Sequence, residues 1–231
     1  MTDETKDPGI PPGEGIYPNT PKDVYVAWRL PSSGSPGVLR KRTLLALKQD
    51  IDAVGWTFRA FNQWLDEDWG FAYQNQIFAA PYLPLCDVPW ACRELEWALS
   101  RGARVIVLRP GAVLTRQGWR SPAAPDFDPF WARVNEAGIT VAIHSGDSGY
   151  LRFTELWGGA GEFQAFDFQP KRLCLSATPV HDMLATLVCD GLFDRHRNLR
   201  VATIESGSSW VSSLLAKLKS PTAMPTRLRS R

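Results

Sequence analysis

The sequence reads Ile139-Thr-Val-Ala-Ile-His144-Ser-Gly-Asp147-Ser-Gly-Tyr150 near its middle, where a short apolar run ends in a histidine and a polar, glycine-rich loop follows. Apolar runs of this length, bounded by turn-forming residues, are typical of buried strands in a parallel sheet. A histidine that ends such a strand lies where α/β barrels place their chemistry. Neutral imidazole at that position suits a divalent metal ion or a proton-transfer role. From these residues alone, a hydrogen-bonded histidine that caps the strand is an equal alternative.

The segments on both sides repeat this alternation of strand and helix. Strands separated by helices of roughly 10–15 residues indicate βαβ units and a parallel sheet. About four such units are predicted, which fits half of a (β/α)8 TIM barrel or an open, doubly wound sheet. No G-x-G-x-x-G follows any strand, so nucleotide binding receives little support. The predicted strands are 77–83, 103–108, 139–144 and 199–204, and the predicted helices are 41–68 with a candidate break at Gly55, 88–100, 129–137, 180–193 and 209–218.

Length and composition fit one large globular domain. The chain has 231 residues, of which 44% are hydrophobic and 22% are charged, as is usual for globular proteins. The net charge of +2 gives no reason to expect a nucleic-acid partner. Residues 1–40, rich in Pro, Gly and Ser, are predicted to be irregular or disordered. The barrel domain is predicted over 41–219, and a basic tail over 220–231.

Cysteine usage and hydropathy bear on the compartment. The four cysteines show no Cys-x-x-Cys spacing, and the N-terminus is acidic and rich in Pro and Gly, unlike a signal peptide. We therefore expect reduced thiols in a cytoplasmic protein and no zinc knuckle. No apolar run approaches the roughly 18 residues that a membrane-spanning helix needs, so no membrane partner is expected.

Four segments together resemble one known family. They are Phe61-Asn62-Gln-Trp64-Leu-Asp-Glu-Asp-Trp69, then Arg93-Glu-Leu-Glu-Trp-Ala98 with Arg101-Gly102-Ala-Arg-Val-Ile-Val, then Phe127-Asp-Pro-Phe130-Trp131 leading to His144, and finally Phe193-Asp-Arg with Asn198-Leu-Arg-Val-Ala. In order and spacing this series resembles amidohydrolase family 2, which includes the aminocarboxymuconate-semialdehyde decarboxylase-like enzymes. The resemblance covers roughly residues 58–219.

The resemblance implies a TIM barrel that holds a divalent metal, commonly zinc, at the carboxyl ends of its strands. The family's usual ligands are a His-x-His pair on strand one, a histidine ending strand five and an aspartate after strand eight, while a histidine ending strand six assists acid–base chemistry. The four strands resemble strands three to six. His144 then falls on the strand-five metal ligand, and Glu205 stands where the strand-six histidine would be. The implied function is a metal-dependent hydrolase or related decarboxylase acting on a small carboxylated or carbonyl-containing molecule.

Two departures from the family pattern are visible. The chain has no His-x-His, since its only histidines are His144, His181 and His196, and it ends after the helix that would follow strand six. We therefore expect a truncated member whose activity is impaired because most metal ligands are missing. The alternative is a non-catalytic remnant that acts, if at all, as an interaction partner. A half barrel would leave strand edges and apolar surface uncovered, which predicts a homodimer or poor solubility.

Glu205 and Arg109 are the two further site candidates. Glu205 is predicted to be a general acid or base, or a carboxylate that contacts metal-bound water. Its structural alternatives are a cap on the helix near Ser209 and an ion pair with Arg109. Arg109 follows its strand directly and is predicted to bind a substrate carboxylate through its guanidinium fork, with a structural ion pair as the alternative. Asp147 is a candidate to orient the imidazole, and a simple turn explains it equally well.

The remaining histidines and the tryptophans are predicted to have structural roles. His181 is expected to serve a helix cap or the surface, and His196, among charged neighbours, is expected to be exposed. Tryptophans in or beside helices are expected to pack helix against barrel. They are Trp64, Trp69, Trp97, Trp131 and Trp157.

Overall fold

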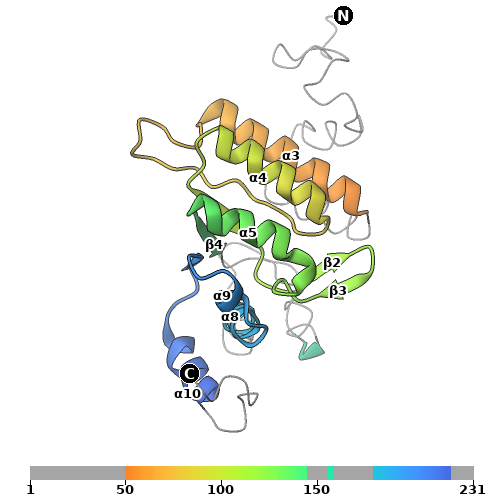
Figure 1. Cartoon of the computed structure of the whole chain (residues 1–231), viewed down its shortest axis with the longest axis vertical. Coiled ribbons are helices and arrows are strands. Elements are labelled where there is room, and N and C mark those ends of the chain that lie inside the picture. Colours follow the sequence, from red (N-terminus) through yellow and green to blue (C-terminus); the bar gives the residue numbers. More distant parts are fainter. Residues whose placement is uncertain (1–49, 145–155, 159–178, 220–231) are drawn as a thin grey trace, which may run out of the picture. The chain divides into compact units, whose positions relative to one another are not determined.

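The computed structural model describes residues 50–144, 156–158 and 179–219. The chain divides into two compact units, residues 1–61 and 62–231. The predicted irregular segment 1–40 and the predicted basic tail 220–231 lie outside the described residues, as does Asp147, so those expectations stay predictions. Figure 1 shows the elements and their order along the chain.

The first described helix, α3 (Ile51–Asp68), runs through Gly55 without interruption, so the suggested break there is wrong. Asp50 caps its first turn, because the Asp50 Oδ1 atom accepts a hydrogen bond of 2.9 Å from the Ala53 N–H. Near its other end, the side chain of Asn62 is fully buried. Its amide donates to the Tyr82 carbonyl at 2.8 Å and accepts from the Tyr82 N–H at 2.9 Å. Asn62 therefore fixes the backbone of an extended segment 20 residues away.

Three parallel strands form the sheet in the order β1 (Val105–Leu108), β4 (Thr140–His144), β5 (Arg200–Ile204). On the other side of β1, Tyr82 forms a single parallel bridge to Val107. The predicted strand 77–83 is thus reduced to two isolated bridges, Tyr82 to Val107 and Ile77 to the nearby Tyr73, since Pro81 and the nearby Pro84 have no N–H to extend a ladder. Neighbouring strands follow chain order without the reversal of a doubly wound sheet. The structure is therefore a mixed α/β fold whose described strands are arranged as in part of a barrel.

Helices connect these strands. Helix α4 (Val88–Ser100) is capped by Asp87, whose carboxylate accepts from the Trp90 N–H at 2.8 Å, and helix α5 (Asp128–Ala137) ends at Gly138 in the left-handed conformation. The helix predicted over 180–193 is two helices, α8 (Pro179–Cys189) and α9 (Leu192–Arg195). Gly191, with a φ of 69°, separates them because few other residues adopt that backbone conformation. Helix α10 (Ser209–Lys219) follows β5.

One face of the sheet carries the main core. Ile106 and Leu108 of β1 and Val141 and Ile143 of β4 are buried, and they belong to one apolar cluster with residues of α4, α5 and α8. The helical members of this cluster include Leu95, Phe130, Trp131, Val134 and Leu187. Because side chains alternate along a strand, His144 points to the opposite face from Ile143.

A short hairpin was not predicted from the sequence. Strands β2 (Val113–Thr115) and β3 (Gly118–Arg120) pair antiparallel in the loop after β1. The Thr115 hydroxyl donates to the Gly118 carbonyl at 2.9 Å and stabilises the turn between them. Strands of three residues are too short to show a period-two pattern, so sequence periodicity gave no signal here.

Replacing Asn62 with alanine is expected to lower the free energy of unfolding by about 2–3 kcal/mol. The substitution removes both hydrogen bonds of Asn62 to the Tyr82 backbone, and loss of the partner of a buried polar group costs roughly 1–3 kcal/mol. Urea denaturation followed by circular dichroism measures the loss. Gln63→Ala is the matched control, since the Gln63 amide donates to the exposed Glu67 carboxylate at the surface; a loss below about 0.5 kcal/mol is expected there. Equal losses of unfolding free energy in Asn62→Ala and Gln63→Ala would contradict the role of Asn62 in fixing the Tyr82 backbone.

Candidate functional site

The three residues proposed from the sequence lie at one edge of the sheet. His144 is the last residue of β4, Glu205 follows β5, and Arg109 follows β1. The strand register places Leu108 beside Ile143 and His144 beside Ile204. Arg109 and Glu205 therefore lie near the level of His144 at the carboxyl ends of three adjacent strands. Parallel α/β sheets bind their ligands at this edge.

His144 and Glu205 form a pair. The His144 Nε2 atom lies 3.5 Å from a Glu205 carboxylate oxygen, with 47% of the histidine side chain and 76% of the glutamate side chain exposed. The sequence had left a helix cap or a pair with Arg109 open for Glu205, and the structure places it beside His144. At this separation and exposure, the attraction is modest and depends on protonation of the imidazole. The pair is therefore accessible to a molecule bound at this edge.

The backbone of Glu205 is strained. Its φ is 56°, in the left-handed region, and Gly207 two residues later has a φ of 60°. For a residue with a side chain this conformation costs roughly 1–2 kcal/mol. Strain of this kind persists where the surroundings hold the residue in place, and it is found most often at functional sites. Glu205 therefore deserves a functional explanation beyond its position at the end of a strand.

Glu205→Gly is expected to stabilise the protein, by about 0.5–1 kcal/mol. Glycine removes the left-handed strain of roughly 1–2 kcal/mol, and its greater freedom in the unfolded chain offsets roughly 0.4–1 kcal/mol of that gain. The melting temperature should rise by about 1–4 °C, measured by differential scanning calorimetry. Glu205→Gln is the control, because it removes the charge and keeps the backbone strain, so no comparable rise is expected. A glycine variant no more stable than the glutamine variant would argue against strain at this position.

The described residues do not by themselves complete a metal site. In the described ranges, no group of three or more His, Cys, Asp or Glu side chains is placed to hold a metal ion. His144 and Glu205 offer two donors, whereas catalytic zinc sites use about three protein ligands. Asp147, the other oxygen donor considered from the sequence, lies outside the described residues.

Cys92 is the described cysteine whose surroundings bear on its reactivity. Cys92 is a partly buried thiol in helix α4. Burial raises the pKa of the Cys92 thiol, and the nearby Glu96 carboxylate raises it further. A raised pKa keeps the thiol protonated at neutral pH, and the thiolate is the nucleophilic form. Cys92 therefore suits packing beside the core better than covalent catalysis.

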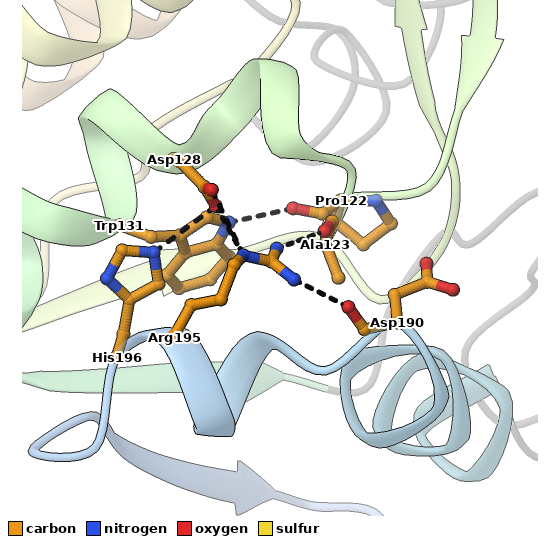
Figure 2. A network of polar contacts seen from close by, with 7 residues as sticks. All are labelled: Pro122, Ala123, Asp128, Trp131, Asp190, Arg195 and His196. Carbon is orange, nitrogen blue, oxygen red and sulfur yellow. Dashed lines mark hydrogen bonds and ion pairs between the residues drawn. The ribbon is translucent and has the colours of Figure 1, made fainter. Parts of the chain in front are cut away.

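The expectation that His196 is exposed is wrong. Only 8% of the surface of His196 is exposed, and its Nε2 atom lies 3.2 Å from the Asp128 carboxylate at the start of α5. Figure 2 shows the network around this contact. Arg195 donates to both Asp128 oxygens at 3.0 Å and to the carbonyls of Ala123 and Asp190 at 2.7 and 2.6 Å. The network joins α9 to the start of α5, so its role is structural.

His181 and the tryptophans named above are predicted to have structural roles. His181 lies in the first turn of α8, with its Nδ1 atom 2.8 Å from the Asp182 carboxylate and only 15% of its side chain exposed. This contact is with a side chain and not with a helix N–H, so the expected cap stays a prediction. Trp131 is fully buried in the core, and Trp97 packs edge-to-face on Phe71 with ring centroids 5.5 Å apart. Packing of helix against sheet is thus confirmed for Trp131, which shares the core cluster with residues of β1 and β4, whereas Trp97 packs on the segment after α3. The other three predicted to pack are exposed: Trp64, Trp69 and Trp157.

The strands are parallel, follow chain order and are joined by helices, and ionisable side chains lie at their carboxyl ends. Proteins of this α/β class bind ligands at the carboxyl edge of the sheet. The family model described as Amidohydrolase matches residues 39–231. The chain belongs to this amidohydrolase family, as its sequence motifs predicted. Among the described residues, no helix is both long enough and apolar enough to span a membrane.

Solved structures agree with this assignment. An amidohydrolase of Mycobacterium avium subsp. paratuberculosis K-10 is 39% identical, with a TM-score of 0.69 over 76% of this chain and 45% of that chain. A 2,6-dihydroxybenzoate decarboxylase from Rhizobium is 19% identical, with a TM-score of 0.55 over 76% of this chain and 53% of that chain. A 2,6-dihydroxybenzoate decarboxylase complexed with 2,6-dihydroxybenzoate is 21% identical, with a TM-score of 0.51 over 66% of this chain and 45% of that chain. The two decarboxylases show similarity of fold alone.

The chain spans about half the length of these solved relatives. No curated protein matches it.

Proposed function

We propose that this chain is a metal-dependent hydrolase or related decarboxylase that acts on a small carboxylated or carbonyl-containing molecule. The observation that carries the proposal is the pairing of His144 with a backbone-strained Glu205 at the carboxyl edge of a parallel sheet. Membership of the amidohydrolase family supports this class of reaction. The decarboxylases of similar fold, named for 2,6-dihydroxybenzoate, suggest a carboxylated aromatic ring as a first substrate to try.

Each residue at this edge has a proposed role. Glu205 transfers a proton to or from the reacting group, because its exposed carboxylate is within reach of a bound substrate. His144, whose Nε2 atom lies 3.5 Å away, orients the Glu205 carboxylate. Arg109 binds the substrate carboxylate through two parallel N–H bonds.

His144 is also the proposed metal ligand, and zinc is the proposed ion. The fit is incomplete, because the described residues offer only two donors at this edge and a catalytic zinc needs about three. The roles proposed for Glu205 and Arg109 do not depend on the metal.

The second candidate is a non-catalytic amidohydrolase remnant that acts as an interaction partner. The observation that favours it is that the described residues supply two donors, His144 and Glu205, at the candidate site. Metal content and turnover decide between the two candidates. The purified chain is loaded with zinc or manganese, and release of carbon dioxide from hydroxybenzoates is assayed beside hydrolysis of small amides and lactones. Turnover that falls in Glu205→Gln supports the enzyme, whereas a folded chain with neither metal nor turnover supports the remnant.

A homodimer is proposed as the assembly. Among the described strands, β5 pairs only with β4, and Ile204 at its end is exposed. An unpaired strand edge beside apolar surface favours pairing with another copy. Sedimentation velocity at micromolar concentration is expected to give a dimer. A monomer that unfolds cooperatively under the same conditions would remove this proposal.

A further inference from the structure

The turn that carries Glu205 contains two residues in the left-handed conformation. Glu205 and Gly207 have φ values of 56° and 60°, with Ser206 between them. Glycine adopts this conformation without cost, whereas glutamate does not. The Glu205 carboxylate is 76% exposed and lies 3.5 Å from His144, a contact too weak to hold the backbone of the turn, so other groups have to hold it.

Two side chains hold this turn. The Ser206 hydroxyl donates to the Ile204 carbonyl at 2.9 Å, and the Trp210 indole N–H donates to the Gly207 carbonyl at 3.0 Å. Trp210 lies in the first turn of α10, and its ring packs against the main apolar core. The indole therefore connects the Glu205 turn to the rigid core by one hydrogen bond.

We propose that Trp210 is a positioning residue of the candidate site, whose indole N–H fixes the turn that holds Glu205 beside His144. This inference rests on the proposed role of Glu205 in proton transfer. Trp210 does not contact the substrate; it acts through the Gly207 carbonyl. A small displacement of a proton-transfer group lowers the rate strongly, since 1 Å can cost about 100-fold.

Trp210→Phe tests the proposal, because phenylalanine keeps a ring for the core and lacks the N–H donor. The measurement is the proton NMR spectrum of the histidine rings in the full-length chain, recorded at one fixed pH. The signal that is followed is the chemical shift of the His144 ring protons. The chain has three histidines, and His144→Ala identifies the His144 signal. Glu205→Gln is expected to move that signal, and Trp210→Phe is expected to move it in the same direction while the His181 and His196 signals stay in place. Where turnover is detected, Trp210→Phe should lower kcat about 10- to 100-fold with little change in KM.

Controls separate this inference from the proposed function. Trp119→Phe removes an indole N–H from a residue that is exposed on β3, so it should leave the His144 signal unchanged. Gly207→Ala disturbs the same turn at the residue whose carbonyl accepts the Trp210 hydrogen bond, because alanine disfavours the left-handed conformation of Gly207. An added Cβ there meets no atom within 4 Å, so it acts through the backbone alone, and it should also move the His144 signal. This second variant decides the matter if Trp210→Phe does not fold.

Two results would overturn the inference. If Glu205→Gln moves the His144 signal and neither turn variant does, Trp210 does not position Glu205. If no variant moves it, Glu205 is not beside His144 in solution. Absence of turnover in every variant, with the His144 signal moving as expected, would count against the proposed function and leave the positioning role standing.

Discussion

His144→Ala is expected to abolish stoichiometric zinc binding by the purified chain, lowering the affinity at least about 100-fold. Loss of a residue that merely orients a metal ligand already costs roughly 10- to 100-fold, and His144 is proposed as a ligand itself. The measurement is metal content per chain on a monodisperse fraction, followed by zinc titration with a competing chelator. The same substitution removes the partner of Glu205 at 3.5 Å, so any turnover should fall with it.

His181→Ala is the matched control for this prediction. His181 is also an imidazole beside a carboxylate, 2.8 Å from Asp182, but it lies at the start of α8. Zinc content that falls equally in both variants would indicate surface binding by histidine in general. A wild-type chain that is folded and binds no zinc would contradict the metal role of His144 and favour the non-catalytic remnant.

Local signals predicted the regular elements well. The helix predicted over 88–100 has those bounds in the structure, because Asp87 supplies its cap and Gly102, with a φ of 86°, follows its last turn. The strand predicted over 139–144 is observed as Thr140–His144, since β-branched residues bounded by glycines give a clear pattern. Signals that lie within one element can be read from one sequence.

Features that depend on distant residues were predicted less well. The charged neighbours of His196 suggested exposure, yet its partner Asp128 comes from a helix 68 residues earlier. The strand at 77–83 was overestimated because Pro81 limits its pairing with β1 to the single Tyr82 bridge. Tertiary contacts decided both cases, and no local pattern contains them.

For the candidate site, too, the sequence predicted the location but not the contact between its residues. Its location followed from the sequence, because parallel strands place the residues that end them at one edge, and Arg109, His144 and Glu205 each end or follow a strand. The pairing of His144 with Glu205 did not follow, since it needs the register of β4 against β5 and the left-handed turn at Glu205. A glutamate followed two residues later by glycine gave no warning of this conformation.

Trp131→Ala is expected to cost about 3–5 kcal/mol of stability, the usual range for truncating a large buried aromatic side chain. Trp131 is fully buried, stacks edge-to-face on Phe130 at 5.5 Å, and donates from its indole to the Pro122 carbonyl at 2.7 Å. Figure 2 shows this bond beside the Asp128–Arg195 contacts. Because small domains are stable by only about 5–15 kcal/mol, the variant should lose a large fraction of its free energy of unfolding.

Two further variants separate the ring from its hydrogen bond. Trp131→Phe keeps most of the apolar volume and leaves the Pro122 carbonyl without its donor, so a loss of about 1–3 kcal/mol is expected. Trp119→Ala removes an indole that is 62% exposed, and its effect should stay within about 0.5 kcal/mol. Urea denaturation of the three variants should therefore rank them Trp131→Ala, Trp131→Phe, Trp119→Ala in order of loss. If Trp131→Ala lowered the free energy of unfolding no more than Trp119→Ala, the core around α5 would not be packed as described. The contacts that join α9 to α5 would then also be in doubt.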